Sequence, residues 1–520
     1  MNYVTKRIIK KFPKFLVLGM FFLFTVESKA QSDSSADASK GNGARSFQVT
    51  PRIYGSETWS DNISLQSVDK KSGWITEASP GIRISSGAGR VKGYLDYSLH
   101  KFIYSGGTGS DSLQNALNSA VSMEVVDNFV FLDVNGNISQ QTTSAFGTQS
   151  NVNGLINSNK TEVSTYSISP YARGRLSSFA DYEVRYSYAS TNAKSDSSVN
   201  STQSQGSFKV SGDEFFGKMR WALNGSRQET NRTAGQNIQV DSLNLTLTYA
   251  VNRQLNFYGV AGQETGNYTS TQKNSSNTSG GGVNWAVDET TKVALDVENR
   301  LLGRMHKLSF EHRTPRTSWR IADSKSISVT NGLTQTSGVN SNYDLLYTLF
   351  ASIEPDPIKR AQMVRDFLQA NGLSTGTSAV NGYLTSSTSI QRVQDVSFAI
   401  LGIRDTLTFT ATKTAGKVVS GTLTSSDDFA AANNIRQNGF TASYSHKLTK
   451  DTAVNAQFTL QNTRTEDTLQ SSTTKYFNVN FSSKVGLKTY ATISARHVIS
   501  SGNSSPYREN ALIGSLMVQF

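Results

Sequence analysis

The sequence predicts an all-β protein, a transmembrane antiparallel up-and-down β-barrel of about 22 strands, within a range of about 20–24. Three observations predict it. From Phe47 onward the chain divides into segments of about 10–14 residues in which apolar and polar side chains alternate. The connections between these segments are short and long in turn, and the last segment runs to the final residue, Phe520.

The composition fits a barrel with a wet interior better than a protein with a large dry core. The chain has 520 residues, 8 prolines and no cysteine, and its hydrophobic fraction is 36%. An ordinary globular domain has about 45–50% apolar residues, a figure that also counts glycine. The absence of cysteine excludes thiolate metal sites, a cysteine nucleophile, disulfides and a lipid anchor on cysteine.

Residues 1–30 have the pattern of a cleaved secretory signal peptide. Basic residues from Lys6 to Lys14 precede an apolar run over 15–26, and Ser28-Lys29-Ala30 fits cleavage between Ala30 and Gln31. The apolar run of about 12 residues is shorter than the roughly 20 that a spanning helix needs. Residues 31–45 are expected to be a disordered periplasmic lead, and 46–520 to form the barrel. Both chain ends are then expected to be periplasmic.

The net charge of +12 falls to about +7 without the first 30 residues. No dense basic run follows position 14, so nucleic acid is not expected as a partner.

The alternation is clear at many positions along the chain. Leu243, Leu245 and Leu247 alternate with Asn244, Thr246 and Thr248. Outer-membrane barrels combine such strands with short periplasmic turns and long external loops. Short connections are expected near 86–89, 126–128, 177–178, 213–215, 251–253, 288–290, 450–451 and 485–487, and long ones near 59–72, 142–159, 191–201, 269–275, 329–387, 414–436 and 465–472. A tight hairpin is implied within 301–316.

The last segment also predicts how the barrel is assembled. Leu516, Val518 and Phe520 share one face of an amphipathic final strand that ends in an aromatic residue. Such an ending resembles the signal read by the bacterial barrel-assembly machinery, which is therefore an expected partner, beside outer-membrane lipid and lipopolysaccharide.

One segment departs from the strand pattern. Apolar residues between 343 and 372 follow helical spacing on both sides of Glu354-Pro355-Asp356-Pro357. We expect a helical hairpin inside a long external loop over 331–387. It could be a lid or plug over the pore, a surface for a partner, or a self-packed cap on the loop.

Charged residues of both signs lie on the faces expected to line the lumen. Candidate anion contacts in the lumen are Arg173, Arg175, Arg185 and Arg220. The alternative is that such residues form cross-strand pairs that stiffen the wall. Aromatic residues near predicted strand ends, among them Phe102 and Trp319, are expected to form interfacial girdles.

The sequence contains no catalytic motif in a suitable context, so an enzyme is not expected. No catalytic, cofactor-binding or metal-binding residue is predicted, and no cofactor. The nearest approach to catalytic residues is His100 near the outer end of its strand. Asp96 lies four residues away, about 13 Å along the strand, which is too far for direct pairing.

Three runs of residues resemble a family of outer-membrane barrels associated with the PEP-CTERM protein-sorting system. They are Trp59–Asn62, Thr76–Arg83 and Gly89–Ser98, with further likeness over 131–147. The resemblance is densest over 47–150. It implies a context in exopolysaccharide biosynthesis and export, with exopolysaccharide or export-complex proteins as partners, and it supplies no catalytic residues. The insertion at 343–372 is a departure from that family.

The leading hypothesis is a non-enzymatic, porin-like or accessory component of surface-polymer export. A sealed structural or interaction barrel is the alternative. A hydrolase at the rim, testable at His100, is a weaker hypothesis. A TonB-type transporter is also weaker, because only about 15 residues of the expected mature chain precede the first strand, far fewer than a plug domain needs.

Overall fold

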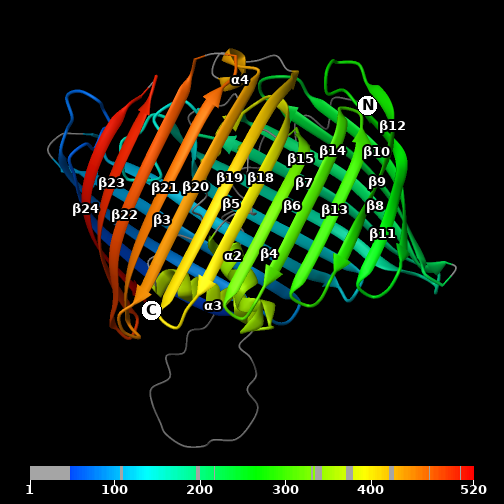
Figure 1. The fold of residues 1–520 in the computed structure, drawn as a ribbon, viewed down its shortest axis with the longest axis horizontal. Helices are drawn as coiled ribbons and strands as arrows, with labels where there is room; N and C mark the ends of the chain where they lie inside the picture. The colour runs from blue at the N-terminus through cyan, green and yellow to red at the C-terminus, as the bar shows by residue number, and fades with distance from the viewer. Residues whose placement is uncertain are drawn as a thin grey trace, which may run out of the picture. The chain divides into compact units, whose positions relative to one another are not determined.

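The computed structural model shows a closed antiparallel β-barrel of 22 strands. It describes residues 47–520 except 106–108, 195–198, 216, 330–331, 334–341, 371–378, 421–426, 468 and 504. Each strand pairs with its neighbours in chain order, and β1 (Gln48–Ser60) pairs with β24 (Tyr507–Gln519) to close the wall. Figure 1 shows this sequential wall as a continuous change of colour around the barrel. The predicted fold class and strand number are confirmed.

The wall strands between these two are long and uniform. They are β2 (Gly73–Ser86), β3 (Val91–Tyr104), β4 (Ser112–Val126), β5 (Val130–Thr142), β6 (Lys160–Leu176), β7 (Ala180–Ala193), β8 (Ser201–Phe215), β9 (Met219–Arg232), β10 (Ile238–Ala250), β11 (Leu255–Gly266), β12 (Asn274–Ala286), β13 (Thr291–Arg300), β14 (Gly303–Arg313), β15 (Thr317–Ser328), β18 (Thr388–Leu401), β19 (Asp405–Ser420), β20 (Asn434–Lys447), β21 (Thr452–Thr465), β22 (Ser471–Gly486) and β23 (Thr489–Gly502).

Alternation along each strand divides the side chains into a luminal face and an outward face. In β20, Gln437, Thr441 and Ser443 are buried toward the lumen, whereas Phe440 and Tyr444 are accessible on the outside. In β10, Leu243, Leu245 and Leu247 are likewise accessible outward. Cross-strand register carries this division around the barrel, because paired residues share a face.

We call the end of the barrel that holds Gln48 and Gln519 the terminal rim, and the opposite end, with Ser60 and Gly73, the loop rim. Connections at the terminal rim are short, as predicted, and most at the loop rim are longer. The implied tight hairpin joins β13 to β14 at the loop rim through 301–302.

Two connections differ from the prediction: one turn comes later in the chain than expected, and one loop is shorter than expected. β8 extends to Phe215, past the turn expected at 213–215, and the loop expected over 414–436 is shortened by β19 and β20 to 421–433. Outward residues Lys413 and Lys417 lie in this upper part of β19. The alternation of apolar and polar residues ends there because both faces are polar, so the pattern could not identify the strand.

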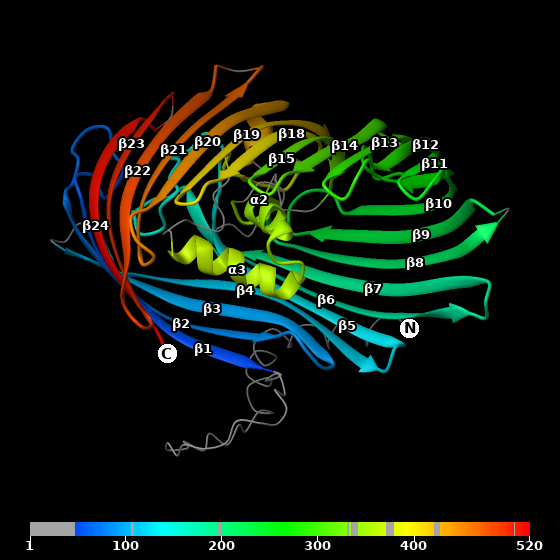
Figure 2. The ribbon, with the colours of Figure 1, turned by 60° about the horizontal axis from the view of Figure 1, so that its bottom comes forward.

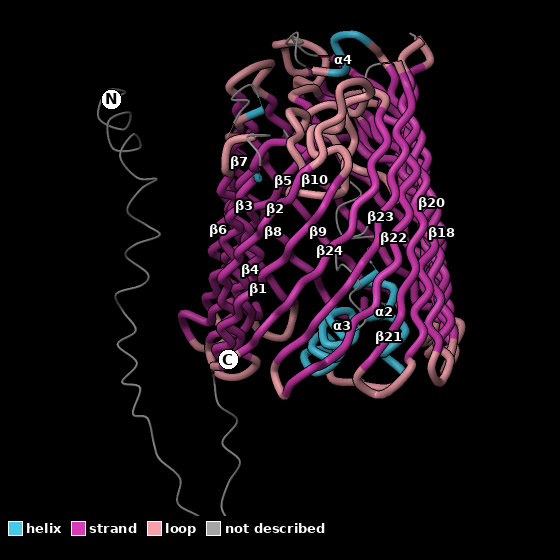
Figure 3. Tube along the Cα trace, turned by 90° about the vertical axis from the view of Figure 1, so that its left-hand side faces the viewer, coloured by secondary structure: helices cyan, strands magenta, loops and turns pink. Residues whose placement is uncertain are grey.

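The predicted helical hairpin is present. It consists of α2 (Asn342–Leu349), the short helix η4 (Phe350–Ser352) and α3 (Pro357–Ala370). Figure 2 shows the barrel strands surrounding α2 and α3, and Figure 3 shows both helices near the end of the barrel that holds the C-terminus. The hairpin therefore lies inside the barrel.

Two small elements complete the described fold: the strand pair β16 (Gly332–Leu333) with β17 (Leu384–Thr385), and the short helix α4 (Asp428–Ala431). None of the described helices is long and apolar enough to span a membrane. The predicted signal peptide, its cleavage after Ala30 before Gln31, and the predicted lead over 31–45 lie outside the described residues.

Candidate functional site

The candidate functional site is the lumen, which is occupied by the chain's own segment between β15 and β18. This segment, residues 329–387, leaves and rejoins the wall at the loop rim. Arg232, at the loop-rim end of β9, reaches both of its ends. Its guanidinium donates to the carbonyl of Val329 and, at 3.2 Å, to the hydroxyl of Thr388. One side chain thus joins β9 to both ends of the segment, which are neighbours through the pairing of Ser328 with Ser389.

The sequence determines where α3 begins. Asp356 accepts a hydrogen bond from the backbone N–H of Lys359 at 3.1 Å, which is a typical N-cap contact. Pro357 occupies the first helical position, where its missing N–H costs nothing.

The hairpin packs through an apolar cluster against the wall near the terminal rim. Leu346 and Leu349 of α2 and Val364 of α3 are fully buried, together with Ala399 of β18, and Leu401 packs against the same cluster. Ala399 is two residues from the terminal-rim end of β18. On the other side, the ammonium of Lys447 lies 5.4 Å from the ring centroid of Phe367. A segment that enters at one mouth therefore obstructs the lumen near the other.

The chain then returns along the luminal face of β20 and β21. The backbone N–H of Asn381 donates to Gln461 at 3.0 Å, and the side chain of Gln437 donates to the carbonyl of Asn381 at 3.0 Å. Gly439 is required for this approach, because a Cβ there would meet the carbonyl oxygen of Ala379.

A single carboxylate fixes the end of the returning limb. Asp427 accepts hydrogen bonds from the Thr385 and Ser387 hydroxyls and from both the backbone N–H and the hydroxyl of Ser386, at 2.8–3.1 Å. It also caps α4 through the N–H of Phe429 at 3.0 Å. Asp427 is 6% exposed, so these donors replace water around a buried charge.

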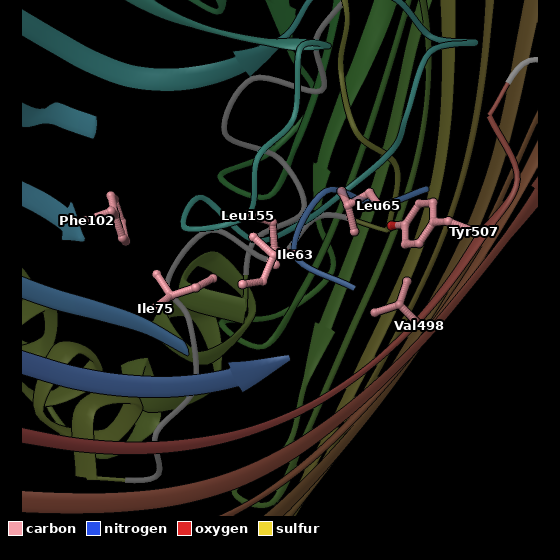
Figure 4. Packing of buried hydrophobic residues seen from close by; sticks show 7 residues of the cluster. All are labelled: Ile63, Leu65, Ile75, Phe102, Leu155, Val498 and Tyr507. Atoms are coloured by element: carbon pink, nitrogen blue, oxygen red, sulfur yellow. The ribbon is translucent and has the colours of Figure 1, made fainter. Parts of the chain in front are cut away.

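Two further loops fold inward at the loop rim. Ile63 and Leu65 from loop 61–72 and Leu155 from loop 143–159 form a buried cluster with wall residues, shown in Figure 4. The hydroxyl of Tyr507 on β24 donates to the carbonyl of Gln149. The prediction that Phe102 belongs to an interfacial girdle is wrong. Phe102 is 4% exposed within this cluster, because its strand position faces the lumen under the inward-folded loops.

The loop 143–159 also contacts α4. Asp428 accepts hydrogen bonds from the hydroxyl of Ser144 at 2.7 Å and the N–H of Ala145 at 2.6 Å. Burial raises the pKa of this carboxyl to about 6, although both hydrogen bonds act to lower it. Phe146 and Phe429 pack with Tyr383 of the luminal segment beside this contact. Three loops distant in sequence therefore meet at the loop rim.

The four luminal arginines predicted from the sequence lie on the wall between β6 and β9. The Arg185 guanidinium is 2.7 Å from Asp133 and 3.0 Å from Glu183, and it stacks over Tyr171. Arg173 stacks over the ring of Phe131 at 4.2 Å, and Arg175 is 3.8 Å from Asp181.

Arg220 donates to Asn256 at 3.3 Å. Arg173, Arg175 and Arg220 remain exposed to the lumen, whereas Arg185 is half-buried among acids. The structure thus brings Arg173, Arg175 and Arg185 to neighbouring strands.

His100 has a set of partners that sequence reasoning missed. Its Nδ1 lies 2.7 Å from Glu77 and 2.8 Å from the hydroxyl of Ser79, and its Nε2 lies 2.9 Å from the hydroxyl of Ser98. Glu77 and Ser79 belong to β2, so only the β2–β3 register brings them to His100. Asp96 instead binds Arg52 at 2.5 Å.

A depression of about 850 Å³ follows the wall along β5 to β11. Most of its lining residues, such as Val184 and Phe208, lie on the outward face of the wall, and Gly206 and Gly225 lack side chains there. It is therefore not an enclosed binding site. Within the described parts of the chain, no group of three His, Asp or Glu side chains could hold a metal ion.

Neither a protein-family model nor a curated protein sequence matches the chain. Solved structures with a similar fold include a double mutant of the ferric enterobactin receptor PfeA from Pseudomonas aeruginosa, with TM-score 0.46, 8% identity, and coverage of 91% of this chain and 80% of that one. Another is the siderophore receptor PirA from Acinetobacter baumannii, with TM-score 0.43, 10% identity, and coverage of 91% of this chain and 80% of that one.

A loop-deletion mutant of the outer-membrane protein OmpT from Vibrio cholerae is also similar, with TM-score 0.31, 7% identity, and coverage of 91% of this chain and 99% of that one. At these identities and scores the likeness assigns no function, so the chain's own residues must carry the functional proposal.

Proposed function

We propose that the protein is an outer-membrane β-barrel that forms a gated, non-enzymatic passage for a polar solute or polymer. The observation that carries this proposal is the segment 329–387, which enters at the loop rim and packs a helical hairpin against Ala399 and Leu401 near the terminal rim. A wall of 22 strands encloses a lumen too wide for its own side chains to fill, so a passage that closes needs a separately folded element inside it.

The membrane location rests on the outward surface. Large apolar side chains are accessible on nearly every strand of the wall, for example Leu245 on β10, Val396 on β18 and Phe458 on β21. Soluble proteins rarely expose contiguous apolar surface on this scale, whereas a barrel in lipid requires it. The terminal rim is then periplasmic and the loop rim external, because short turns face the periplasm in such barrels.

The luminal wall behind the returning limb suits a polar polymer. Thr408, Thr410 and Thr412 of β19 and Thr441 and Ser443 of β20 face inward. Hydroxyl and amide side chains pair with sugar hydroxyls without binding them as tightly as charges would. Together with the resemblance to barrels found beside exopolysaccharide genes, this favours a surface polysaccharide as the transported material.

Single-channel conductance of the refolded protein in a planar bilayer tests the proposal. The full chain is compared with a variant in which a short Gly/Ser linker replaces residues 331–387. We expect brief or small openings from the full chain and larger, stable openings from the deletion variant. Soluble polysaccharides that block the larger current would identify the material.

Silence from both folded proteins would contradict the passage. It would favour the alternative of a sealed barrel that acts as a scaffold for surface assembly.

The His100 network favours a second candidate function, hydrolysis of an ester or amide. Ser98, His100 and Glu77 have the order and spacing of a nucleophile, a general base and an orienting carboxylate. Incubation with a fluorophosphonate probe should label Ser98 in the native protein and leave Ser98→Ala and His100→Ala unlabelled. Absence of labelling in the folded native protein would leave the network as a structural part of the wall.

A further inference from the structure

Basic side chains are concentrated on the outward face of one sector of the wall, β15 and β18 to β24. They lie toward the loop rim and are Lys325, Arg392, Lys413, Lys417, Arg436, Arg464, Lys475 and Arg508. All eight are exposed or half-buried. The acidic side chains on the same face of these strands and their connections include Asp323 and Glu466, which bind Arg392 and Arg436.

These residues form a band at one height. Arg392 is nine residues from the terminal-rim end of β18, Arg436 eleven from that of β20, and Lys475 eleven from that of β22. A strand rises about 3.3 Å per residue and tilts by about 35–45°, so the band lies about 20–30 Å above the terminal rim. The apolar belt of an outer-membrane barrel is about 25 Å tall. The band is therefore at the level of the outer-leaflet head groups.

The band contains two like-charged cross-strand pairs, and an acid binds one member of each, Arg392 or Arg436. Lys325 stands directly opposite Arg392, and Arg436 directly opposite Arg464, in the strand register. Like charges in directly opposite positions destabilise a sheet. Among the described residues, Lys413, Arg464 and Lys475 form no ion pair. The structure thus gathers cations without acidic partners beside paired ones on a single face of the wall.

In the opposite sector of the wall, more of the outward basic side chains have acidic partners. Three of its outward basic residues near the loop rim pair with acids: Lys101 lies 3.2 Å from Asp111, Arg227 lies 2.9 Å from Glu229, and Lys273 lies 3.1 Å from Asp241. The excess of positive charge belongs to one side of the barrel. A general need for solubility at the rim would not produce this asymmetry.

We propose that the band from Lys325 to Arg508 binds the phosphate groups of a phosphorylated glycolipid in the outer leaflet of the membrane. The lipid's phosphates would bridge the like-charged pairs, since ammonium and guanidinium groups form their strongest contacts with such oxygens. Its acyl chains would lie on the aromatic surface below, where Trp319 packs against Phe398 with centroids 3.9 Å apart. The inference rests on the proposed membrane location and is independent of gating.

Native mass spectrometry of the full refolded chain with bisphosphorylated lipid A, fully dephosphorylated lipid A and inorganic phosphate tests this inference. The test variant is Lys413→Gln/Arg464→Gln/Lys475→Gln. The matched control, Lys101→Gln/Arg227→Gln/Lys273→Gln, removes the same charge from the opposite sector. We expect the native chain and the control to bind bisphosphorylated lipid A within about twofold of each other, and the test variant at least about tenfold more weakly.

Equal weakening in both variants, or none in the test variant, would overturn the inference. Equal binding of dephosphorylated lipid A would overturn the role of phosphate, and competition by inorganic phosphate alone would overturn the assignment to a lipid. The milder variant Lys413→Gln/Lys475→Gln serves if the triple variant does not fold. Conductance of the same samples reports separately on the passage, so failure of one proposal does not imply failure of the other.

Discussion

At the scale of single residues, the most buried ion pair joins the last strands to the first. Arg496 on β23 and Glu509 on β24 form two hydrogen bonds, at 3.0 and 2.6 Å, and their side chains are 5% and 0% exposed. Ser60 at the end of β1 donates to the same carboxylate at 3.0 Å. The contact therefore reaches across the closing pair of strands.

Glu509→Ala should destabilise the barrel by about 3–5 kcal/mol, because it leaves the Arg496 guanidinium buried without its partner. Urea unfolding of the refolded protein in micelles measures the change as a lower transition midpoint. The double variant Arg496→Met/Glu509→Leu should be clearly more stable than the single variant, since it removes both charges. If Glu509→Ala matches the native protein, the pair contributes nothing to closure.

Asp428 makes the contact between α4 and loop 143–159 dependent on pH. Its pKa in the folded state, about 6, is above the ordinary value of 3.8, so the folded contact binds a proton more tightly than the open one. The contact should be strongest below about pH 4, weaken as pH rises toward about 6, and stay constant above.

Hydrogen exchange at the Ala145 amide measures this change. Its protection factor, corrected for the intrinsic exchange rate, should fall about tenfold to a hundredfold across that window. In Asp428→Asn the protection should not vary with pH. A rise in protection with pH in the native protein would reverse the sign and contradict the assignment.

At the scale of secondary-structure elements, the hairpin shows what local sequence can and cannot determine. Helical spacing and Asp356-Pro357 identify α2 and α3 and the start of α3. The same apolar faces would also fit a self-packed cap outside the barrel. The contact with Ala399 places the hairpin inside the barrel. Ala399 is a small residue on an ordinary strand, and nothing in its local sequence indicates that a helix packs against it.

Leu346→Ala/Leu349→Ala should release the hairpin from the wall. Both side chains are fully buried, and each truncation costs about 2–5 kcal/mol, which is large against the stability of two short helices. Tryptic cleavage after Arg360 in α3, identified by mass spectrometry, should become faster, and conductance should rise. Ile353→Ala is the matched control, because Ile353 is 52% exposed. Unchanged cleavage in the double variant would show that other contacts hold the hairpin.

At the scale of the whole molecule, the wall was predictable and its contents were not. The two-residue period and the rhythm of turns identify a barrel of 22 strands because every strand separates lipid from water in the same way. The occupied lumen depends on contacts such as Asn381 with Gln461 and Tyr507 with Gln149, which join positions far apart in the chain. The His100 network was missed for the same reason, since Glu77 reaches it only through cross-strand register.

The uneven distribution of charge around the lumen leads to a final prediction about selectivity. The returning limb and the hairpin pack on β18 to β22, whereas Arg173 and Arg220 on the opposite wall remain exposed to the lumen. Any ion that passes the luminal segment should therefore travel beside these guanidinium groups, which attract anions. A passage with this wall should prefer chloride to potassium, more strongly at low ionic strength, where screening is weaker.

Reversal potentials in a KCl gradient measure this preference in the deletion variant lacking 331–387. Arg173→Gln/Arg220→Gln in that background should shift the preference toward cations. The outward pair Arg464→Gln/Lys475→Gln removes the same charge outside the lumen and should leave it unchanged. If both pairs of substitutions shift the reversal potential equally, the passage responds to the net charge of the protein, and the luminal arginines serve only to stiffen the wall through stacking such as that of Arg173 on Phe131.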